Sequence, residues 1–155
     1  MRKFNFSLQK VLNYRETIEE KLLTELAALR AEHERETAKL SEITACRTRF
    51  CKEMKKKLTA GNPEDIKEAY RYLDGITLQV KAQELTVRIA AERKDKKMAE
   101  VIEASKDRKI LERLRDYKLL EHKKEALHHE QKFLDDIAGI HHSRIKSADA
   151  ANGGH

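Results

Sequence analysis

The first sixty residues contain neither glycine nor proline, and this absence limits the fold more than any other feature of the sequence. Turns depend on these residues, because glycine reaches backbone conformations closed to other residues and proline ends helices. The whole chain of 155 residues has five glycines and one proline. Charged residues make up 39% and apolar residues also 39%, which is typical of long helices that bury a narrow stripe. The sequence therefore predicts an all-α protein with little globular core.

Apolar residues in the first half of the chain recur at alternating steps of three and four, the spacing of a coiled-coil seam. They are Leu8, Val11, Ile18, Leu22, Leu26, Leu29, Leu40, Ile43, Phe50, Met54 and Leu58. Two consecutive steps of four, ending at Leu26, depart from the strict heptad. Four polar residues share the seam: Arg15, His33, Glu36 and Arg47. We interpret them as determinants of register or partner, or as a sign that the seam is only half covered there.

One short segment, Gly61-Asn62-Pro63-Glu64-Asp65, interrupts the helical pattern. We expect Gly61 to be the left-handed residue after a helix end, Asn62 to cap the next helix and Pro63 to open it. A turn this short requires the two helices to be adjacent and antiparallel. The predicted fold is a single antiparallel coiled-coil hairpin over residues 1–146. Its helices are expected at about 7–60 and 63–138, its turn at 61–62, and a disordered tail at 147–155.

The second predicted helix carries an apolar stripe that is regular as far as Val101 and thinner beyond it. Its members are Ile66, Tyr70, Leu73, Ile76, Val80, Val87, Met98, Val101, Leu111, Leu114, Leu119, Phe133 and Ile137. At the rise of an α-helix, this helix should extend about 30 Å beyond the first. An isolated helix with a leftover apolar stripe needs a partner, so the sequence indicates a binding function.

No arrangement of residues in the sequence indicates catalysis. Five scattered glycines cannot form a phosphate-binding loop, and Thr37 and Phe133 stand where a zinc motif of the HExxH type needs its second histidine. His122 and His129 lie seven residues apart, but a solvated helix face explains them better than a metal site. We therefore expect no enzyme activity, no cofactor, no metal and no small-molecule substrate.

The formal charge of +6 includes one clear basic patch. Residues 47–57 contain six basic residues and Glu53 as their single acid. A zipper-type DNA-binding protein needs a leucine zipper directly after its basic region, whereas this helix is expected to end near Gly61. We therefore interpret the patch as a charged hairpin tip and expect no nucleic-acid partner. We also expect neither a membrane span nor a signal peptide.

Three segments of the sequence carry a family resemblance. They are Phe4-Asn5-Phe6-Ser7-Leu8-Gln9-Lys10-Val11-Leu12 with Arg15 and Glu19-Glu20 after it, Tyr70-Arg71-Tyr72-Leu73, and Glu130-Gln131-Lys132 followed by Leu134-Asp135-Asp136-Ile137-Ala138. In this order they resemble the opening, the aromatic start of the second helix, and the ending of the FliJ family. That family is the small cytoplasmic component of the flagellar type III export apparatus.

The resemblance implies a stalk similar to the central stalk (gamma subunit) of rotary ATPases. Its terminal end would enter the export ATPase ring, and its hairpin end would face the membrane-embedded export gate. By position, the gate contact corresponds to Ile43, Phe50, Tyr72 and Ile76. Further matches fall on Cys46, Gln79 and Gln83, where this sequence departs in residue type. In the alternative interpretation, Ile43, Phe50 and Ile76 form the seam between the two helices.

Mixed charge near the end of the second helix suits polar contacts with a ring. The basic residues expected to make these contacts are Arg108, Lys109, Arg113, Arg115 and Lys118. The resemblance also implies export chaperones as partners and a cytoplasmic protein associated peripherally with the cell membrane. An alternative function is a general coiled-coil chaperone or scaffold that acts without an ATPase.

Overall fold

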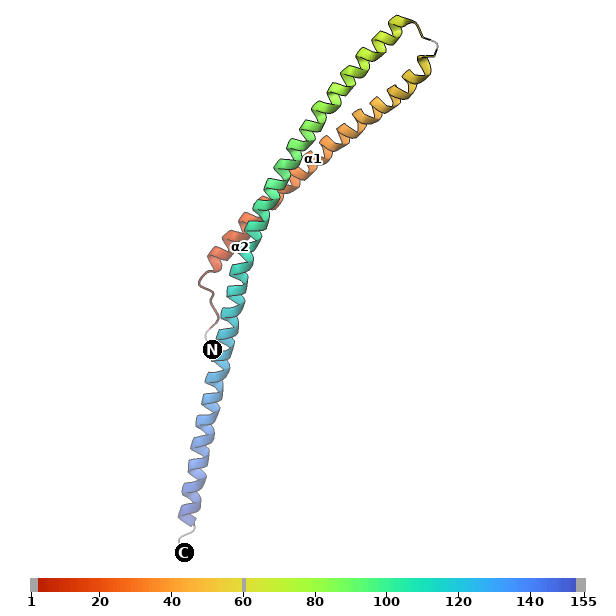
Figure 1. Ribbon diagram of the computed structural model, residues 1–155. Helices are drawn as coiled ribbons and strands as arrows, with labels where there is room; N and C mark the ends of the chain where they lie inside the picture. The colour runs from red at the N-terminus through yellow and green to blue at the C-terminus, as the bar shows by residue number, and fades with distance from the viewer. Residues whose placement is uncertain (1–2, 60, 153–155) are drawn as a thin grey trace. The chain divides into compact units, whose positions relative to one another are not determined.

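The computed structural model describes residues 3–59 and 61–152, with side chains as far as Arg144. These residues form two long helices packed against each other, and no strand occurs among them. Helix α1 comprises the 49 residues Gln9–Lys57, and helix α2 comprises the 90 residues Pro63–Asn152 (Figure 1). The all-α prediction is confirmed.

Helix α1 is slightly shorter than expected at both ends. It begins at Gln9, where the carbonyl oxygen of Leu8 accepts the N–H of Leu12 at 3.0 Å. It ends at Lys57, although the N–H of Leu58 still donates to the Met54 carbonyl oxygen at 2.9 Å. Because nothing between these residues breaks a helix, backbone hydrogen bonding continues without interruption.

The turn differs from the expectation at Gly61. No described glycine has a positive φ, so Gly61 is not the left-handed residue after a helix end. The physical reason is that α1 has already ended at Lys57. A Cβ atom on Gly61 would lie only 2.9 Å from the Lys57 carbonyl oxygen, so the glycine permits a close backbone approach.

Helix α2 begins at Pro63 and continues well beyond its expected end. The Asn62 carbonyl oxygen accepts the Ile66 N–H at 3.2 Å, which places Asn62 at the helix cap. The helix passes Gly139 and reaches Asn152, although the sequence predicts its end near residue 138. An interior glycine costs only about 1 kcal/mol relative to alanine, and no proline follows Pro63. The predicted tail is therefore helical over residues 147–152, and residues 153–155 lie outside the described part of the chain.

Contacts within the chain form two compact units, whereas the sequence predicts one domain over residues 1–146. Unit 1 combines the N-terminal residues as far as Tyr14 with the chain from Asp107 onward. Unit 2 is the continuous stretch Arg15–Lys106. Each unit contains a part of α1 and a part of α2.

Unit 2 is held together by a narrow seam between its two helices, which lie side by side (Figure 1). Its buried side chains are Leu26 of α1 and Ile76, Val80 and Ala90 of α2. Four pairs mark the contact: Glu25 with Lys97, Glu32 with Arg93, Glu36 with Gln83, and Phe50 with Tyr72. A seam with so few buried residues makes each of them important for stability.

Along α1, side chains that are buried or half-buried keep a strict seven-residue repeat. One row of this repeat is Leu12, Glu19, Leu26, His33, Leu40, Arg47 and Met54. This row passes through Leu26 without a break, so it does not contain the departure from the heptad that the sequence predicted before Leu26. The predicted seam residues Leu8 and Val11 are exposed, whereas Leu12 is fully buried. Val11 and Leu12 are adjacent and both apolar, so spacing alone could not distinguish them.

On α2, the seam includes Lys97, whereas the sequence predicts Met98 at this point. Met98 is exposed, whereas Lys97 retains only 22% exposure of its side chain. The Lys97 ammonium pairs with Glu25 at 3.0 Å and with Glu100 at 2.7 Å. A lysine can cover a seam with its alkyl chain while its ammonium reaches acids at the margin.

Candidate functional site

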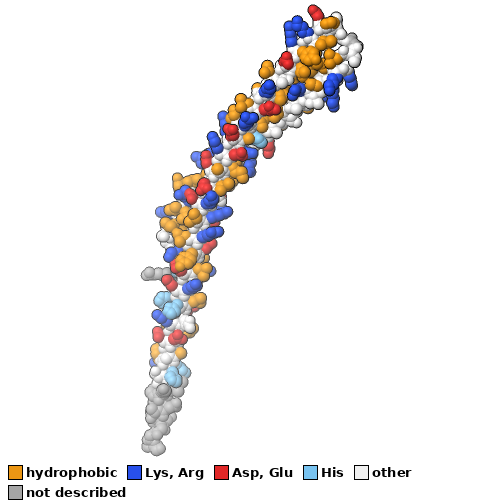
Figure 2. Space-filling model, viewed as in Figure 1, with side chains coloured by type: hydrophobic (Ala, Val, Ile, Leu, Met, Phe, Trp, Pro, Cys, Tyr) orange, Lys and Arg blue, Asp and Glu red, His pale blue; other side chains and the backbone are white. Residues whose placement is uncertain are grey.

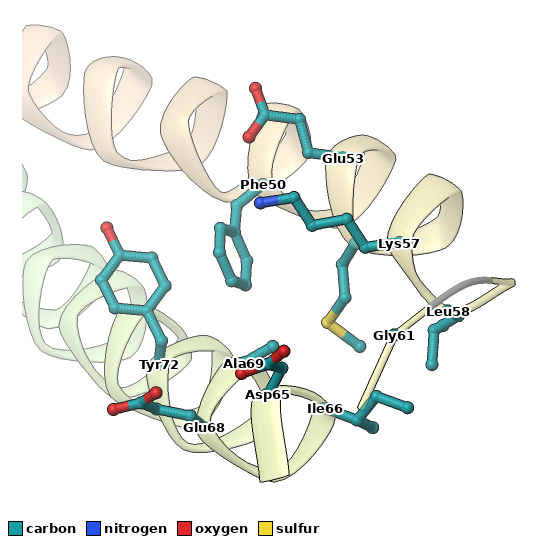
Figure 3. Close-up of a pocket in the computed structure, with 11 residues that line it drawn as sticks. Phe50, Glu53, Lys57, Leu58, Gly61, Asp65, Ile66, Glu68, Ala69 and Tyr72 are labelled. Atoms are coloured by element: carbon teal, nitrogen blue, oxygen red, sulfur yellow. The ribbon is translucent and has the colours of Figure 1, made fainter. Parts of the chain in front are cut away.

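A cleft lies beside the turn, between the end of α1 and the start of α2 (Figure 3). Its volume is about 680 Å³. Its apolar side chains are Phe50 and Met54 from α1, Leu58 from the turn, and Ile66, Ala69 and Tyr72 from α2. The rings of Phe50 and Tyr72 meet edge to face with centroids 4.6 Å apart and close the side of the cleft away from the turn. We call this feature the turn cleft.

Four charged residues also line the turn cleft, and three of them are acidic. Glu53 and Lys57 belong to α1, whereas Asp65 and Glu68 belong to α2 (Figure 3). The last turn of α1 is basic. Figure 2 shows apolar side chains gathered beside the turn with Lys and Arg side chains at their margin. The turn cleft thus combines an apolar interior with a mainly acidic lining.

The structure brings together two of the four residues expected to contact the export gate. Phe50 and Tyr72 touch each other in the turn cleft, and Tyr72 is 52% exposed. Ile43 is half-buried in the seven-residue pattern of α1. Ile76 is only 5% exposed and belongs to the seam. Burial at Ile76 favours the alternative interpretation, in which this residue holds the helices together.

The three weaker matches to the gate contact have different environments. Cys46 is half-buried and Gln79 is exposed. The side-chain amide of Gln83 donates to Glu36 across the helix pair, at 3.0 Å to the backbone carbonyl oxygen and 2.7 Å to the carboxylate. Hydrogen bonds from Lys39 and Gln83 hold the pKa of Glu36 below its ordinary value. Glu36 and Gln83 therefore form a polar contact within the seam, as a register determinant would.

Sequence reasoning missed most of the turn cleft. Met54 and Leu58 were assigned to the seam of the first helix, and Ile66 to that of the second. Their pattern is seam-like, but two helices joined by a short turn must separate there to let the backbone cross between them. Apolar seam residues within about two helical turns of Gly61 were the available signal for an open cleft.

In unit 1, the N-terminal segment covers part of α2. Phe6 and Leu12 are buried, and the Phe4 ring meets the His122 ring edge to face with centroids 5.7 Å apart. The residues that open the chain therefore have a packing role in this unit.

The five basic residues expected to contact the ATPase ring all lie on α2 within unit 1. Arg108 hydrogen-bonds Glu112 one turn along the helix. Arg115 pairs with Asp116 at 3.4 Å, and Lys118 pairs with Glu121 at 2.8 Å. Lys109 and Arg113 are exposed. Of the five, we regard Lys109 and Arg113 as the most accessible to a partner.

Tyr117, Lys118 and Glu121 form a hydrogen-bonded cluster on one helix. Glu121 raises the pKa values of both Tyr117 and Lys118. Lys118 first, and then Tyr117, lowers the pKa of Glu121. Each shift moves the group further from neutral pH, whereas an acid or base catalyst needs a pKa near its working pH. This cluster is suited to binding and to helix stability.

From Leu127 to Arg144, every side chain of α2 is exposed. We call these residues the open segment. Its large apolar side chains are Leu127, Phe133, Leu134, Ile137 and Ile140. Exposed apolar side chains at helical spacing indicate a surface for another helix.

A family model described as the flagellar FliJ protein matches residues 4–147, nearly the whole chain. This chain belongs to the FliJ family. The match covers the opening, aromatic and closing segments that carry the resemblance in the sequence, so the resemblance is confirmed. No curated protein and no solved structure matches the chain. FliJ membership implies a component of the flagellar export apparatus.

The described residues of this FliJ chain show neither a metal cluster nor a membrane span. No group of three or more His, Cys, Asp or Glu side chains among them could hold a metal ion. Within the same residues, no helix has an apolar stretch long enough to cross a membrane. The surfaces described above for this FliJ protein are the turn cleft, the basic residues of unit 1 and the open segment.

Proposed function

We propose that this FliJ protein is a non-catalytic stalk of the flagellar export apparatus. Residues of unit 1 on α2 bind the export ATPase ring, and the turn region of unit 2 binds the export gate. The stalk promotes assembly of the ATPase and delivery of export substrates with their chaperones. The observation that carries the proposal is the open segment, a helix with exposed apolar side chains in a member of the FliJ family.

The same proposal includes an antiparallel coiled-coil hairpin similar to the central stalk of rotary ATPases. Contacts in unit 2 support it, because partners with rising numbers on α1 have falling numbers on α2. Glu25 pairs with Lys97, and Phe50 meets Tyr72. The seven-residue repeat of α1 adds the spacing that such a coil requires. A long coil of this type supplies the stiffness that a stalk needs.

Basic and apolar residues contribute to ring binding in different ways. Lys109 and Arg113 make exposed, salt-sensitive contacts that orient the stalk. The open segment supplies apolar area, and its burial adds to the binding free energy. The protein acts at the cytoplasmic face of the cell membrane, where its proposed gate partner is embedded.

The test mixes the full chain with the export ATPase of the same bacterium and measures ATP hydrolysis and ring assembly. We expect the wild-type chain to stimulate both. The double variant Lys109→Glu/Arg113→Glu reverses two exposed charges, and we expect it to reduce the stimulation by about fivefold or more. The double variant Lys55→Glu/Lys56→Glu is the matched control, because it makes the same charge change in unit 2.

Two outcomes would contradict the proposal. Equal stimulation by both double variants would exclude Lys109 and Arg113 as ring contacts. A wild-type chain that neither stimulates hydrolysis nor assembles the ring would instead favour a chaperone or scaffold that acts without an ATPase. Circular dichroism of each variant distinguishes lost contacts from lost helix.

A further inference from the structure

We propose that the turn cleft holds one large apolar side chain of the export gate, presented on a segment that carries neighbouring Lys or Arg residues. This inference rests on the proposed function, in which the turn region contacts the gate. It adds the chemical character of the gate segment and the residues that recognise it.

The apolar interior supplies the anchor site. Met54, Ile66 and Ala69 are half-buried, and Leu58 remains exposed. The cleft volume of about 680 Å³ lies in the range of pockets that hold compact ligands. Interfaces gain most of their affinity where a large side chain fills such a pocket and loses its water. The volume exceeds that of one side chain, so a leucine, methionine or phenylalanine from the gate would enter together with part of the segment that carries it.

The turn limits how far the cleft can close by itself. The Gly61 backbone lies close to the Lys57 carbonyl oxygen: a Cβ atom added at Gly61 would be only 2.9 Å from it. On the opposite side, the contact between the Phe50 and Tyr72 rings blocks the space between the helices. The cleft is therefore bounded on both sides, and the flexible Met54 side chain can adapt to the shape of the anchor.

The charges of the lining select the neighbours of the anchor. Glu53, Asp65 and Glu68 outnumber Lys57 at the cleft. A basic residue beside the anchor would pair with these carboxylates, whereas an acidic residue would be repelled. Asp65 and Glu68 both belong to the α2 wall, so the basic residue should approach from that side.

Two pairs of variants test the proposal with matched controls. Ala69→Leu fills the cleft, and Ala82→Leu makes the same change at an exposed position of α2 outside it. Asp65→Lys reverses a charge of the cleft, and Glu64→Lys reverses its neighbour in the same first turn. Alanine and leucine have similar helix propensities, and both lysine variants lose the same favourable contact with the helix dipole. Each cleft variant thus differs from its control mainly because its substituted residue lines the cleft and that of the control does not.

Binding is measured by calorimetry between the full chain and the purified cytoplasmic domain of the export gate. We expect Ala69→Leu to weaken binding by about tenfold or more, and Asp65→Lys by about fivefold. Both controls should stay within about twofold of the wild-type affinity. Overlapping peptides from the gate domain then locate the segment, which should contain a large apolar residue beside Lys or Arg.

The remaining outcomes separate the cleft from the proposed function. Gate binding that is unchanged in Ala69→Leu and Asp65→Lys would overturn the cleft and leave gate binding intact. A wild-type chain that does not bind the gate domain would overturn both. Self-association of the wild-type chain that Ala69→Leu abolishes would overturn the gate segment as occupant and identify a second copy instead. Unchanged helical content and thermal midpoint are required of every variant compared.

Discussion

Two isoleucines of α2 have opposite environments. Ile76 in unit 2 is 5% exposed, whereas Ile137 in the open segment is 47% exposed. Both belong to apolar rows at helical spacing on the same helix. They differ because side chains of α1 cover the seam in unit 2, whereas nothing described covers the open segment. An apolar row therefore marks a face that needs covering and does not identify what covers it.

The largest difference in stability should appear when a buried leucine of unit 2 and an exposed leucine of the open segment are each replaced by alanine. Leu26→Ala removes a seam side chain that is 3% exposed, and we expect it to cost about 2–5 kcal/mol of the free energy of unfolding. Leu134→Ala in the open segment should change this free energy by about 0.5 kcal/mol or less. Urea denaturation followed by circular dichroism measures both. Equal losses would break the comparison and mean that the open segment is covered in solution, for example by a second copy.

A smaller effect should follow from enlarging an alanine. Ala90 is buried in the seam, so Ala90→Leu should cost about 1–3 kcal/mol through overpacking. Ala99→Leu is the matched control on the exposed side of the same helix, and it should be nearly neutral. Thermal unfolding compares the two variants. An Ala90→Leu variant as stable as the wild type would show that the helices of unit 2 can move apart at this point without losing stability.

The smallest effect should be the pH dependence of unit 2. Hydrogen bonding and charge from Lys97 lower the pKa of Glu25, and Lys39 and Gln83 lower that of Glu36, both from an ordinary value of 4.5. A lowered pKa in the folded state contributes stability above the ordinary value, and this contribution is lost as the pH falls through the folded value. Stability should therefore decrease between about pH 5 and pH 3. Because these groups are near solvent, salt should reduce the effect.

The thermal midpoint at pH 5 and at pH 3 measures this contribution. In Glu25→Gln/Glu36→Gln the midpoint should fall less between these two values than in the wild-type chain. The pKa of Lys97 is raised, chiefly by hydrogen bonds to Glu100 and Glu25, so its own contribution should be lost only above its ordinary value of 10.5. An identical pH dependence in the double variant and the wild type would assign the acid sensitivity to other carboxylates.

The sequence predicted local features of the helices well where one residue type has one physical role. Pro63 opens α2 and Asn62 caps it, because a missing N–H and a cap both act within one turn. The seam residues Leu26, Ile76 and Val80 also followed from spacing alone. The predicted end of α2 near Gly139 was wrong, because one glycine is a weak signal within a long stretch of helix formers.

Less of the candidate site could be predicted. The resemblance predicted Phe50, Tyr72 and Ile76 as contacts of the export gate, and that role stays a prediction. It did not indicate that the Phe50 and Tyr72 rings touch each other or that Ile76 is buried. The turn cleft itself depends on where two helices separate, which no single residue encodes. Lys97 instead of Met98 on the seam depends on acids of both helices, Glu25 and Glu100, that hold the ammonium.

The sequence by itself determined that this FliJ chain is two long helices joined by a short turn. Helix propensity, the seven-residue repeat and the Asn62-Pro63 helix start act over a few residues, so they can be read along the chain. Only the tertiary structure decided which apolar rows are covered, and that Gly61 serves a close approach to Lys57 and not a left-handed turn. Burial depends on residues distant in the sequence, and the open segment keeps its exposed apolar row because no described part of α1 packs on it.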